Sequence, residues 1–419
     1  MKIAQVITNF SESSLALAKA LAEDGHYSDL YICVTDKNLN ELAGLKIVTQ
    51  KRKVGGIYEL DYRKSTGANW CLNSERCHVY IVQCFHTGQH SKGVKKQIVS
   101  IIFKYYIGKL CSLLKKKKYD CIDIITQNES FSVMGDYLKH ENVIRSFHEI
   151  LNNHFTNDSL LPIVQQAILH NDNIRVFSDK SASDILEKVG SSFDKNNLFT
   201  VPFGLFNSYS EFGDIVIPEI EELDKFVLFF GQIHPYKGLP NLYEAVRLIN
   251  ENGGNVKVVV AGRGNDNCLD KIKADSHFVL INRFISNDEL AYLIRKCRMV
   301  VCPYLSVSQS GIPQTAFVFS KPIVASNLGA FAELIIPNET GLLVNPKDLK
   351  GLSNAIEQLY DNDVLYSCCC NNIKEHEHST SRYSWKSIVT SYTNMVQNIS
   401  IKHIKHDNKE SYKASKQTF

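Results

Sequence analysis

The sequence predicts an α/β protein built from two Rossmann-like, doubly wound domains, and three observations support this fold class. Short apolar runs alternate with longer segments of helical periodicity through both halves of the chain. A length of 419 residues is enough for two domains that each bury a core of their own. An acidic, proline-containing segment over residues 207–225 separates the two halves and predicts a linker.

Residues 1–206 form the predicted first domain. Its N-terminal apolar run turns polar too soon for the core of a signal peptide, so we expect it to be the first strand. The apolar runs typical of strands cover residues 2–7, 30–34, 78–84, 121–126, 142–147, 174–177 and 198–201.

The predicted second domain covers residues 226–382. Its strands are expected over residues 226–230, 258–262 and 299–304, and a further strand is expected to end at residue 285. A helix is expected over residues 288–298. A last helix is predicted over residues 383–400. The tail of residues 401–419 is polar and rich in lysine, which predicts disorder.

The turn after strand 226–230 presents a single lysine, Lys237, between Gly231 and Gly238. A helix then follows, with apolar residues at helical spacing from residue 239 to residue 249. A lysine ammonium in such a strand-to-helix turn can meet phosphate oxygens as a point charge. The pattern therefore suits a diphosphate, and the alternative is an ordinary surface loop with a solvated lysine.

Several further blocks follow this turn in a fixed order, at residues 258–262, 299–304, 309–311, 319–326, 329–333 and 338–344. Their order and spacing resemble the C-terminal half of glycosyltransferase family 4, over residues from about 226 to 350. That family consists of retaining enzymes with the GT-B fold, in which two Rossmann-like domains face each other across a cleft. The resemblance implies that the second domain binds the donor, that the first binds the acceptor, and that the helix 383–400 crosses back to the first domain.

The implied activity is metal-independent transfer of a hexose-type sugar from a nucleotide-diphosphate sugar donor to a glycan or lipid-linked glycan acceptor. The product would be a growing surface polysaccharide, such as lipopolysaccharide, or a glycolipid, and no cofactor is expected. Lys237 would neutralise the leaving diphosphate, next to Gly231. Gln309, Ser310 and Gly311, before the next helix, would offer side-chain and backbone donors to phosphate or sugar.

Two further residues are implied as site residues by the resemblance. His148 follows the strand 142–147 at the edge where open α/β sheets place ligands, and would donate a hydrogen bond to the donor sugar. From the residues alone, a histidine in that place is more often a packing or capping residue. Glu333 matches a glutamate of the family, although an acid in a first helical turn is also favoured by the helix dipole.

The chain departs from the family pattern at three positions. Gln232 stands where an arginine is common, so Arg263 or Arg283 would have to supply the second cationic contact with the donor. Two glutamates that many members carry eight positions apart correspond to Val307 and Thr315. The departures fit a branch with Gln-Ser-Gly in this region, and they leave two alternatives open, a non-catalytic partner in glycan assembly and a nucleotide-sugar epimerase on the same fold.

Composition limits the remaining possibilities. A net charge of +3, from 47 basic and 44 acidic residues, argues against nucleic acid as a partner. The 12 cysteines lack the spacing of a zinc site or a disulfide framework, which favours a reducing cytoplasm. The only Asp-x-Asp triplet, at residues 361–363, is typical of a solvated turn, so no metal site is predicted.

A lysine run follows an apolar, aromatic helical segment of the first domain. Lys115 to Lys118 end a segment that contains three aromatic residues and several leucines and isoleucines. Such a helix can hold a protein on an anionic membrane, here the inner face of the plasma membrane. The alternative is a solvated helix end whose lysines complement the helix dipole.

Overall fold

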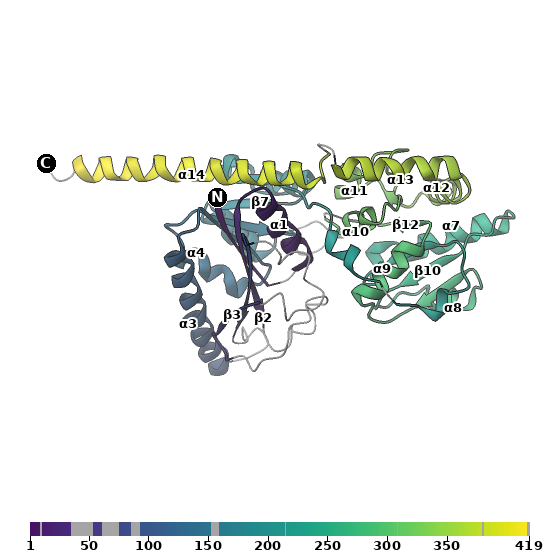
Figure 1. The fold of residues 1–419 in the computed structure, drawn as a ribbon, viewed down its shortest axis with the longest axis horizontal. Helices are drawn as coiled ribbons and strands as arrows, with labels where there is room; N and C mark the ends of the chain where they lie inside the picture. Colours follow the sequence, from purple (N-terminus) through teal and green to yellow (C-terminus); the bar gives the residue numbers. More distant parts are fainter. Residues whose placement is uncertain are drawn as a thin grey trace.

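The computed structural model describes residues 1–8, 11–34, 53–60, 75–84, 93–151, 159–213, 215–307, 309–378 and 381–416. These residues form two α/β domains, each with a sheet of mainly parallel strands between helices (Figure 1). The predicted fold class, two doubly wound domains, is confirmed.

The N-terminal domain contains an 8-stranded sheet in the order β3-β4-β2-β1-β5-β6-β7-β8. Every neighbouring pair is parallel except β3 with β4. The prediction missed β3, since a three-residue edge strand has too few residues to show a period. The strands are β1 Lys2–Ile7, β2 Tyr27–Val34, β3 Ile57–Glu59, β4 Cys77–Gln83, β5 Cys121–Ile125, β6 Val143–Phe147, β7 Asn173–Val176 and β8 Leu198–Thr200.

Helices cover both faces of this sheet, as the connections between parallel strands require. The α-helices are α1 Ser11–Glu23, α3 Gly93–Lys117, α4 Val133–Tyr137, α5 Pro162–Leu169 and α6 Asp179–Val189. Short 3-10 helices lie at η2 Glu129–Ser132, η3 Gly190–Ser192 and η4 Lys195–Asn197.

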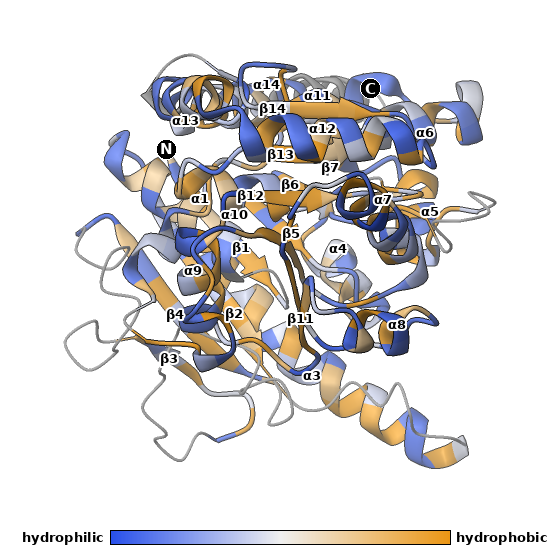
Figure 2. Ribbon diagram, turned by 90° about the vertical axis from the view of Figure 1, so that its right-hand side faces the viewer, coloured by the Kyte–Doolittle hydropathy of each residue, from blue (hydrophilic) through white to orange (hydrophobic). Residues whose placement is uncertain are grey.

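The C-terminal domain has a 6-stranded, fully parallel sheet in the order β11-β10-β9-β12-β13-β14. Successive side chains of its central strand alternate between two cores, with Leu228 and Phe230 on one face and Val227 and Phe229 on the other. Burial on both faces explains why these strands are apolar throughout (Figure 2). The strands are β9 Val227–Phe230, β10 Val258–Ala261, β11 Phe278–Ile281, β12 Met299–Cys302, β13 Ile323–Ser326 and β14 Gly341–Val344.

One strand boundary differs from the prediction. The strand expected to end at residue 285 ends at Ile281, because the Asn282 side chain bonds to the backbone N–H and C=O of Gly264 at 3.1 Å each. The helices of this domain are α7 Leu239–Glu251, α8 Leu269–Ala274, α9 Asn287–Lys296, α10 Ile312–Val318, α11 Gly329–Leu334, α12 Leu349–Asp361 and α13 Asp363–His378, with the 3-10 helix η7 Pro235–Lys237.

The segment predicted as a linker is packed rather than free. It contains the 3-10 helices η5 Asn207–Glu211 and η6 Pro218–Ile220. Ile217 and Ile220 are each 2% exposed and belong to a core of the C-terminal domain. The linker is therefore anchored to the second domain before its first strand begins.

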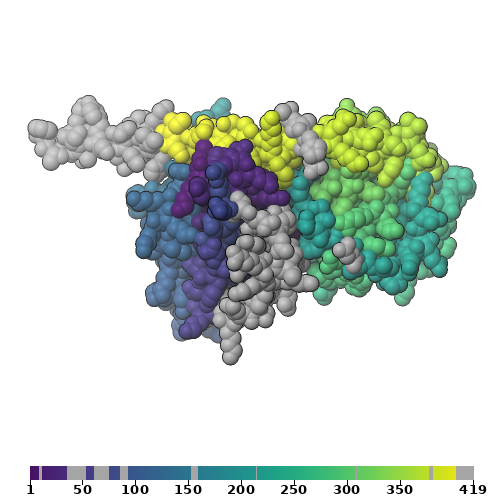
Figure 3. Space-filling model, viewed as in Figure 1, coloured from purple at the N-terminus to yellow at the C-terminus, as the bar shows by residue number. Residues whose placement is uncertain are grey.

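The last helix is α14 Trp385–Lys416, and its first half packs on the N-terminal domain, with buried residues from Ile388 to Ile399 (Figure 3). Tyr392 is fully buried there and donates to Asp123 at 2.9 Å, and Asp123 also pairs with Arg175 at 3.2 Å. The helix continues to Lys416, so the disorder predicted from residue 401 is corrected over that stretch. Residues 401–416 contain neither proline nor glycine to end a helix.

Candidate donor site between the two domains

A cavity of about 300 Å³ lies between the two domains. The N-terminal side and the linker contribute Glu149, Phe206 and Tyr209. The C-terminal domain contributes the rest of the lining, from the turn after β9, the segment after β12, and helices α9 and α10. These residues are Phe230, Tyr236, Lys237, Leu290, Tyr304, Val307, Gln309, Ser310, Gly311, Ile312 and Thr315.

The turn after β9 places Lys237 in the cavity wall, and two glycines make that possible. Gly231 has φ of +96°, and a Cβ atom there would lie 2.8 Å from the Nζ atom of Lys237. Gly238 has φ of +69°, and a Cβ atom there would lie 2.0 Å from the carbonyl oxygen of Pro303. Both glycines are therefore needed for the chain to bring the ammonium group this close to the end of the sheet.

Lys237 is a buried cation beside an open volume. Its side chain is 7% exposed, and burial lowers its pKa to about 8. Among the described residues no carboxylate forms an ion pair with it, and its nearest aromatic partner is the ring of Tyr304, 5.4 Å from Nζ. Because burial without a counter-charge disfavours the ammonium form, an anion in the cavity would be bound strongly here.

The segment before α10 forms another part of the wall, and it holds the predicted Gln309, Ser310 and Gly311. The side-chain N and O atoms of Gln309 are buried and make no hydrogen bond to the residues that the structure describes. Ser310 Oγ accepts a long bond of 3.4 Å from the backbone N–H of Ile312. This wall can therefore both donate to and accept from a polar ligand.

The two positions where the resemblance led us to expect glutamates also face this cavity. Val307 and Thr315 both line it. The Thr315 hydroxyl donates to the carbonyl of Gly311 at 3.0 Å, within its own helix. The cavity wall therefore carries neutral side chains at these two positions.

Three predicted donor contacts do not line the cavity. Gln232 is exposed and bonds to His234 at 3.2 Å. Arg263 is exposed on the adjoining turn, where its carbonyl accepts from the N–H of Ile233 at 3.0 Å. Arg283 pairs with Glu289 at 2.6 Å. The second cationic contact that we expected from an arginine is therefore absent from the cavity lining in this structure.

Glu333 lies in a contact between the domains and not in the cavity lining. Its carboxylate accepts hydrogen bonds from the backbone N–H groups of Asp179 and Lys180, at 3.0 and 2.9 Å, at the start of α6. It also pairs with Arg382 at 2.9 Å, and Arg382 in turn reaches Asp179 at 2.8 Å. We call this group, Glu333, Arg382, Asp179 and the Lys180 backbone, the interdomain latch.

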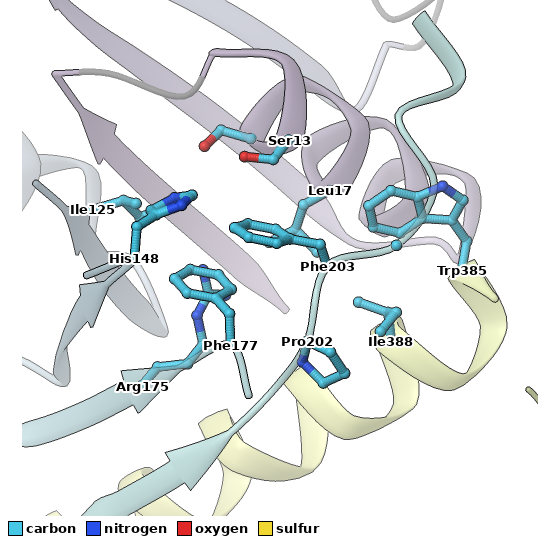
Figure 4. A pocket seen from close by; sticks show the side chains of 12 residues that line it. Ser13, Leu17, Ile125, His148, Arg175, Phe177, Pro202, Phe203, Trp385 and Ile388 are labelled. Carbon is cyan, nitrogen blue, oxygen red and sulfur yellow. The ribbon is translucent and has the colours of Figure 1, made fainter. Parts of the chain in front are cut away.

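His148 lines a second, much smaller pocket of about 10 Å³ (Figure 4). Its ring packs against those of Phe177 and Phe203, with centroids 4.5 and 4.7 Å away. Burial, and then the charge of Arg175, hold the pKa of His148 well below its usual range. The imidazole is therefore neutral at pH 7, and its neighbour Glu149 already belongs to the larger cavity.

The sequence reasoning missed the contribution of the turn after β8. Residues 201–206, which include Pro202 and Gly204, were not among the predicted site residues. In the structure Phe203 stacks against His148, and Phe206 lines the large cavity. Their aromatic side chains beside a Pro/Gly turn were the available signal.

Comparisons with known proteins agree with this architecture. Residues 224–362 match the family described as Glycosyl transferases group 1. The uncharacterized glycosyltransferase MJ1178 of Methanocaldococcus jannaschii is 31% identical over 169 residues, which are 39% of this chain and 45% of that protein. The phosphatidyl-myo-inositol mannosyltransferase of Mycolicibacterium smegmatis is 22% identical over 276 residues, 64% of this chain and 69% of that protein.

A solved structure extends the likeness to the whole chain. The catalytic domain of starch synthase IV from Arabidopsis thaliana, bound to ADP and acarbose, superposes with a TM-score of 0.64 at 13% identity, covering 96% of this chain and 99% of that one. The fold of this protein is therefore GT-B, as the resemblance implied. The family match covers the domain that supplies Lys237 and most of the cavity wall.

Proposed function

We propose that this protein is a glycosyltransferase that binds a nucleotide-diphosphate sugar in the cavity between its domains. The observation that carries the proposal is Lys237, a buried cation without an ion-pair partner among the described residues, on the wall of a cavity of about 300 Å³. A pyrophosphate is an anion that would fit this wall. Its charge would compensate the desolvation of the ammonium group.

The reaction breaks the bond between the anomeric carbon and the diphosphate oxygen and forms a bond from that carbon to the acceptor hydroxyl oxygen, whose proton leaves with the diphosphate. Negative charge grows on the leaving diphosphate, and Lys237 stabilises it in a site with little water. With a pKa of about 8, the lysine is mostly protonated at neutral pH. Gln309 and Ser310 supply hydrogen bonds to the phosphate or the sugar, and the neutral His148 donates one to the sugar.

We propose retention of the anomeric configuration and a growing surface polysaccharide or a glycolipid as the acceptor, bound by the N-terminal domain. The printed names of similar proteins support this class, because one is a phosphatidyl-myo-inositol mannosyltransferase and another serves capsular polysaccharide biosynthesis. We place the reaction in the cytoplasm, on the inner face of the plasma membrane. The described cysteines are all free, which agrees with a reducing compartment.

A second candidate function is a non-catalytic partner that binds a nucleotide sugar within an assembly. The neutral side chains of Val307 and Thr315 favour it, because both face the cavity where many family members carry glutamates. An epimerase on the same fold is a third candidate, and the same experiment separates all three.

The test is an assay of purified protein with uridine, adenosine, guanosine and cytidine diphosphate sugars, with and without glycan and glycolipid acceptors. Release of nucleoside diphosphate only when an acceptor is present, with the product anomer assigned by NMR, would support the transferase. An inverted product would contradict retention. Binding without turnover would favour the partner, and a changed sugar on an intact nucleotide would favour the epimerase.

A further inference from the structure

The outer face of α3 carries an apolar stripe that is exposed in the part of the chain that the structure describes. Val94, Ile98, Ile101 and Tyr105 are 70%, 53%, 67% and 59% exposed. Their spacing of four, three and four residues places them one above the other on a single face of the helix. We call these four residues the outer stripe.

The inner face of α3 already supplies what the domain needs. Its buried residues are Val99, Phe103, Ile107, Leu110, Cys111 and Leu114, and all of them except Val99 belong to the core beside β1, β2 and β5. The surface helix of a soluble domain normally turns a polar face outward. A helix that is apolar on both faces, with one of them exposed, indicates that the second face has a partner of its own.

Charge identifies the chemistry of that partner. The helix has seven lysines, at residues 95, 96, 104, 109, 115, 116 and 117, and neither aspartate nor glutamate. Two of them adjoin the outer stripe, because Lys104 lies one turn after Ile101 and the Nζ atom of Lys109 lies 4.6 Å from the ring of Tyr105. A cationic rim around an apolar stripe is complementary to anionic head groups above acyl chains.

We propose that the outer stripe docks this protein onto an anionic lipid bilayer, with α3 lying in the interface. By length and composition α3 is long and apolar enough to cross a membrane, the only such helix among the described residues. It does not cross, because its inner face belongs to the core of the domain. A second copy of the chain is a poor partner, since two such faces would bring their lysines together.

One lysine of the run at the end of α3 is engaged inside the fold. Lys117 is only partly exposed, and its ammonium group bonds to Asp29 at 3.2 Å and to the Tyr80 hydroxyl at 2.9 Å. Part of the run therefore holds α3 to the sheet. The proposed membrane contact is the outer stripe, in the N-terminal half of the helix.

The position of the outer stripe deepens the proposed function. Since α3 connects the parallel strands β4 and β5, it runs opposite to them, and its N-terminal half lies toward the carboxyl ends of the sheet. His148 follows β6 at the same edge. The inference rests on the proposed function in one point only. If the acceptor is lipid-linked, it would arrive on the side of the domain that faces the site.

The experiment is co-sedimentation of the full chain with vesicles of phosphatidylcholine alone and of equimolar phosphatidylcholine and phosphatidylglycerol. We expect binding to the anionic vesicles only, weakened by salt. Ile98→Gln with Ile101→Gln should lower partitioning by roughly tenfold or more. Lys104→Gln with Lys109→Gln should lower it by about fivefold per lysine.

Two matched control variants remove apolar residues or lysines from surfaces outside α3. Leu169→Gln with Val364→Gln removes two residues that are 83% and 82% exposed outside α3, and Lys271→Gln with Lys273→Gln removes two exposed lysines of α8. Both should bind as the wild type does. Equal binding to neutral vesicles, no binding to either kind, or wild-type binding by the Ile98/Ile101 variant would overturn the proposal.

Stabilisation by nucleoside diphosphates, measured on the same preparations, separates this proposal from the proposed function. It also reports folding, because a variant that retains the thermal shift has an intact site. If docking fails while the nucleotide shift persists, only the membrane inference is wrong. If docking holds and no nucleotide shifts the protein, the proposed function is wrong and the membrane surface stands.

Discussion

Lys237 and His148 occupy comparable places in the two domains, yet their surroundings differ. Each follows a strand of a parallel sheet, and burial lowers the pKa of both. Lys237 borders a cavity of about 300 Å³, whereas His148 lines one of about 10 Å³ and packs beside the stacked rings of Phe177 and Phe203. In the proposed function the lysine meets the charge that a ligand brings, while the histidine is packed against aromatic rings.

The largest expected effect is on turnover after Lys237→Met, which keeps the volume and removes the charge. Loss of a preorganised cation at the leaving group should lower kcat by about 10²- to 10³-fold. Steady-state kinetics with the donor identified by the assay above would measure it. A fall of less than threefold would show that the leaving diphosphate does not meet this lysine.

Replacing the histidine should have a smaller and different effect. His148→Phe preserves the aromatic stack with Phe177 and Phe203 and removes one neutral hydrogen bond, so we expect turnover to fall by about tenfold with nucleotide affinity unchanged. A loss of nucleotide affinity equal to that in Lys237→Met would contradict the division of roles.

The same variant tests the buried imidazole by acid titration. Since the folded-state pKa of His148 is lowered, its contribution to stability is present above the unfolded value of about 6.5 and is lost as the pH falls below it. The stability of the wild type should therefore fall between about pH 6.5 and pH 5 more steeply than that of His148→Phe. Urea unfolding across this range measures the difference, and parallel curves would argue against a buried neutral imidazole.

Nucleotide affinity should also depend on alkaline pH through Lys237. Because an anion prefers the protonated lysine, affinity should stay level below the pKa of about 8 and fall toward tenfold per pH unit above it. Calorimetric titration of a nucleoside diphosphate from about pH 7 to about pH 10 would measure this fall in affinity. An ordinary lysine stays protonated over most of this range. An unchanged affinity across that range would show that the ammonium group is not part of the phosphate site.

The smallest effect is expected at the interdomain latch. Glu333→Gln and Arg382→Gln should each destabilise the protein by about 1 kcal/mol, and a double-mutant cycle should show that the two are coupled. If Glu333 serves only the latch, both variants will have the same nucleotide affinity. Weaker binding by Glu333→Gln alone would place Glu333 at the donor, as the resemblance to the family implied.

The sequence was most informative where local pattern decides the structure. The strands of both sheets were predictable because burial on both faces makes them apolar throughout. The turn around Lys237 was predictable because close contacts within the turn require glycine at its two ends. The strand β3 was not predictable, because it is a three-residue strand at the edge of the sheet. The end of β11 was not predictable either, because a side-chain hydrogen bond of Asn282 decides it.

The site itself was predictable only in part. Lys237, Gln309, Ser310 and Gly311 meet in one cavity because they follow strands of the same sheet. The contribution of Phe206 and the engagement of Glu333 depend on how two separately folded domains pack together. For Phe206 the local signal was only an aromatic residue beside a Pro/Gly turn, and Glu333 leaves no local pattern because its partners are far away along the chain.

The most direct test of the central claim is the stability of wild type and Lys237→Met at pH 7, with and without the nucleoside diphosphate. A fall of the lysine pKa from 10.5 to about 8 means that its burial costs the free protein about 3 kcal/mol. Without nucleotide, the variant should therefore be the more stable by up to that amount. Nucleotide at about 1,000 times its Kd should stabilise only the wild type, by about 4 kcal/mol, and reverse the order. Two results would contradict the account. Without nucleotide, the wild type could be at least as stable as the variant, or added nucleotide could stabilise both proteins equally.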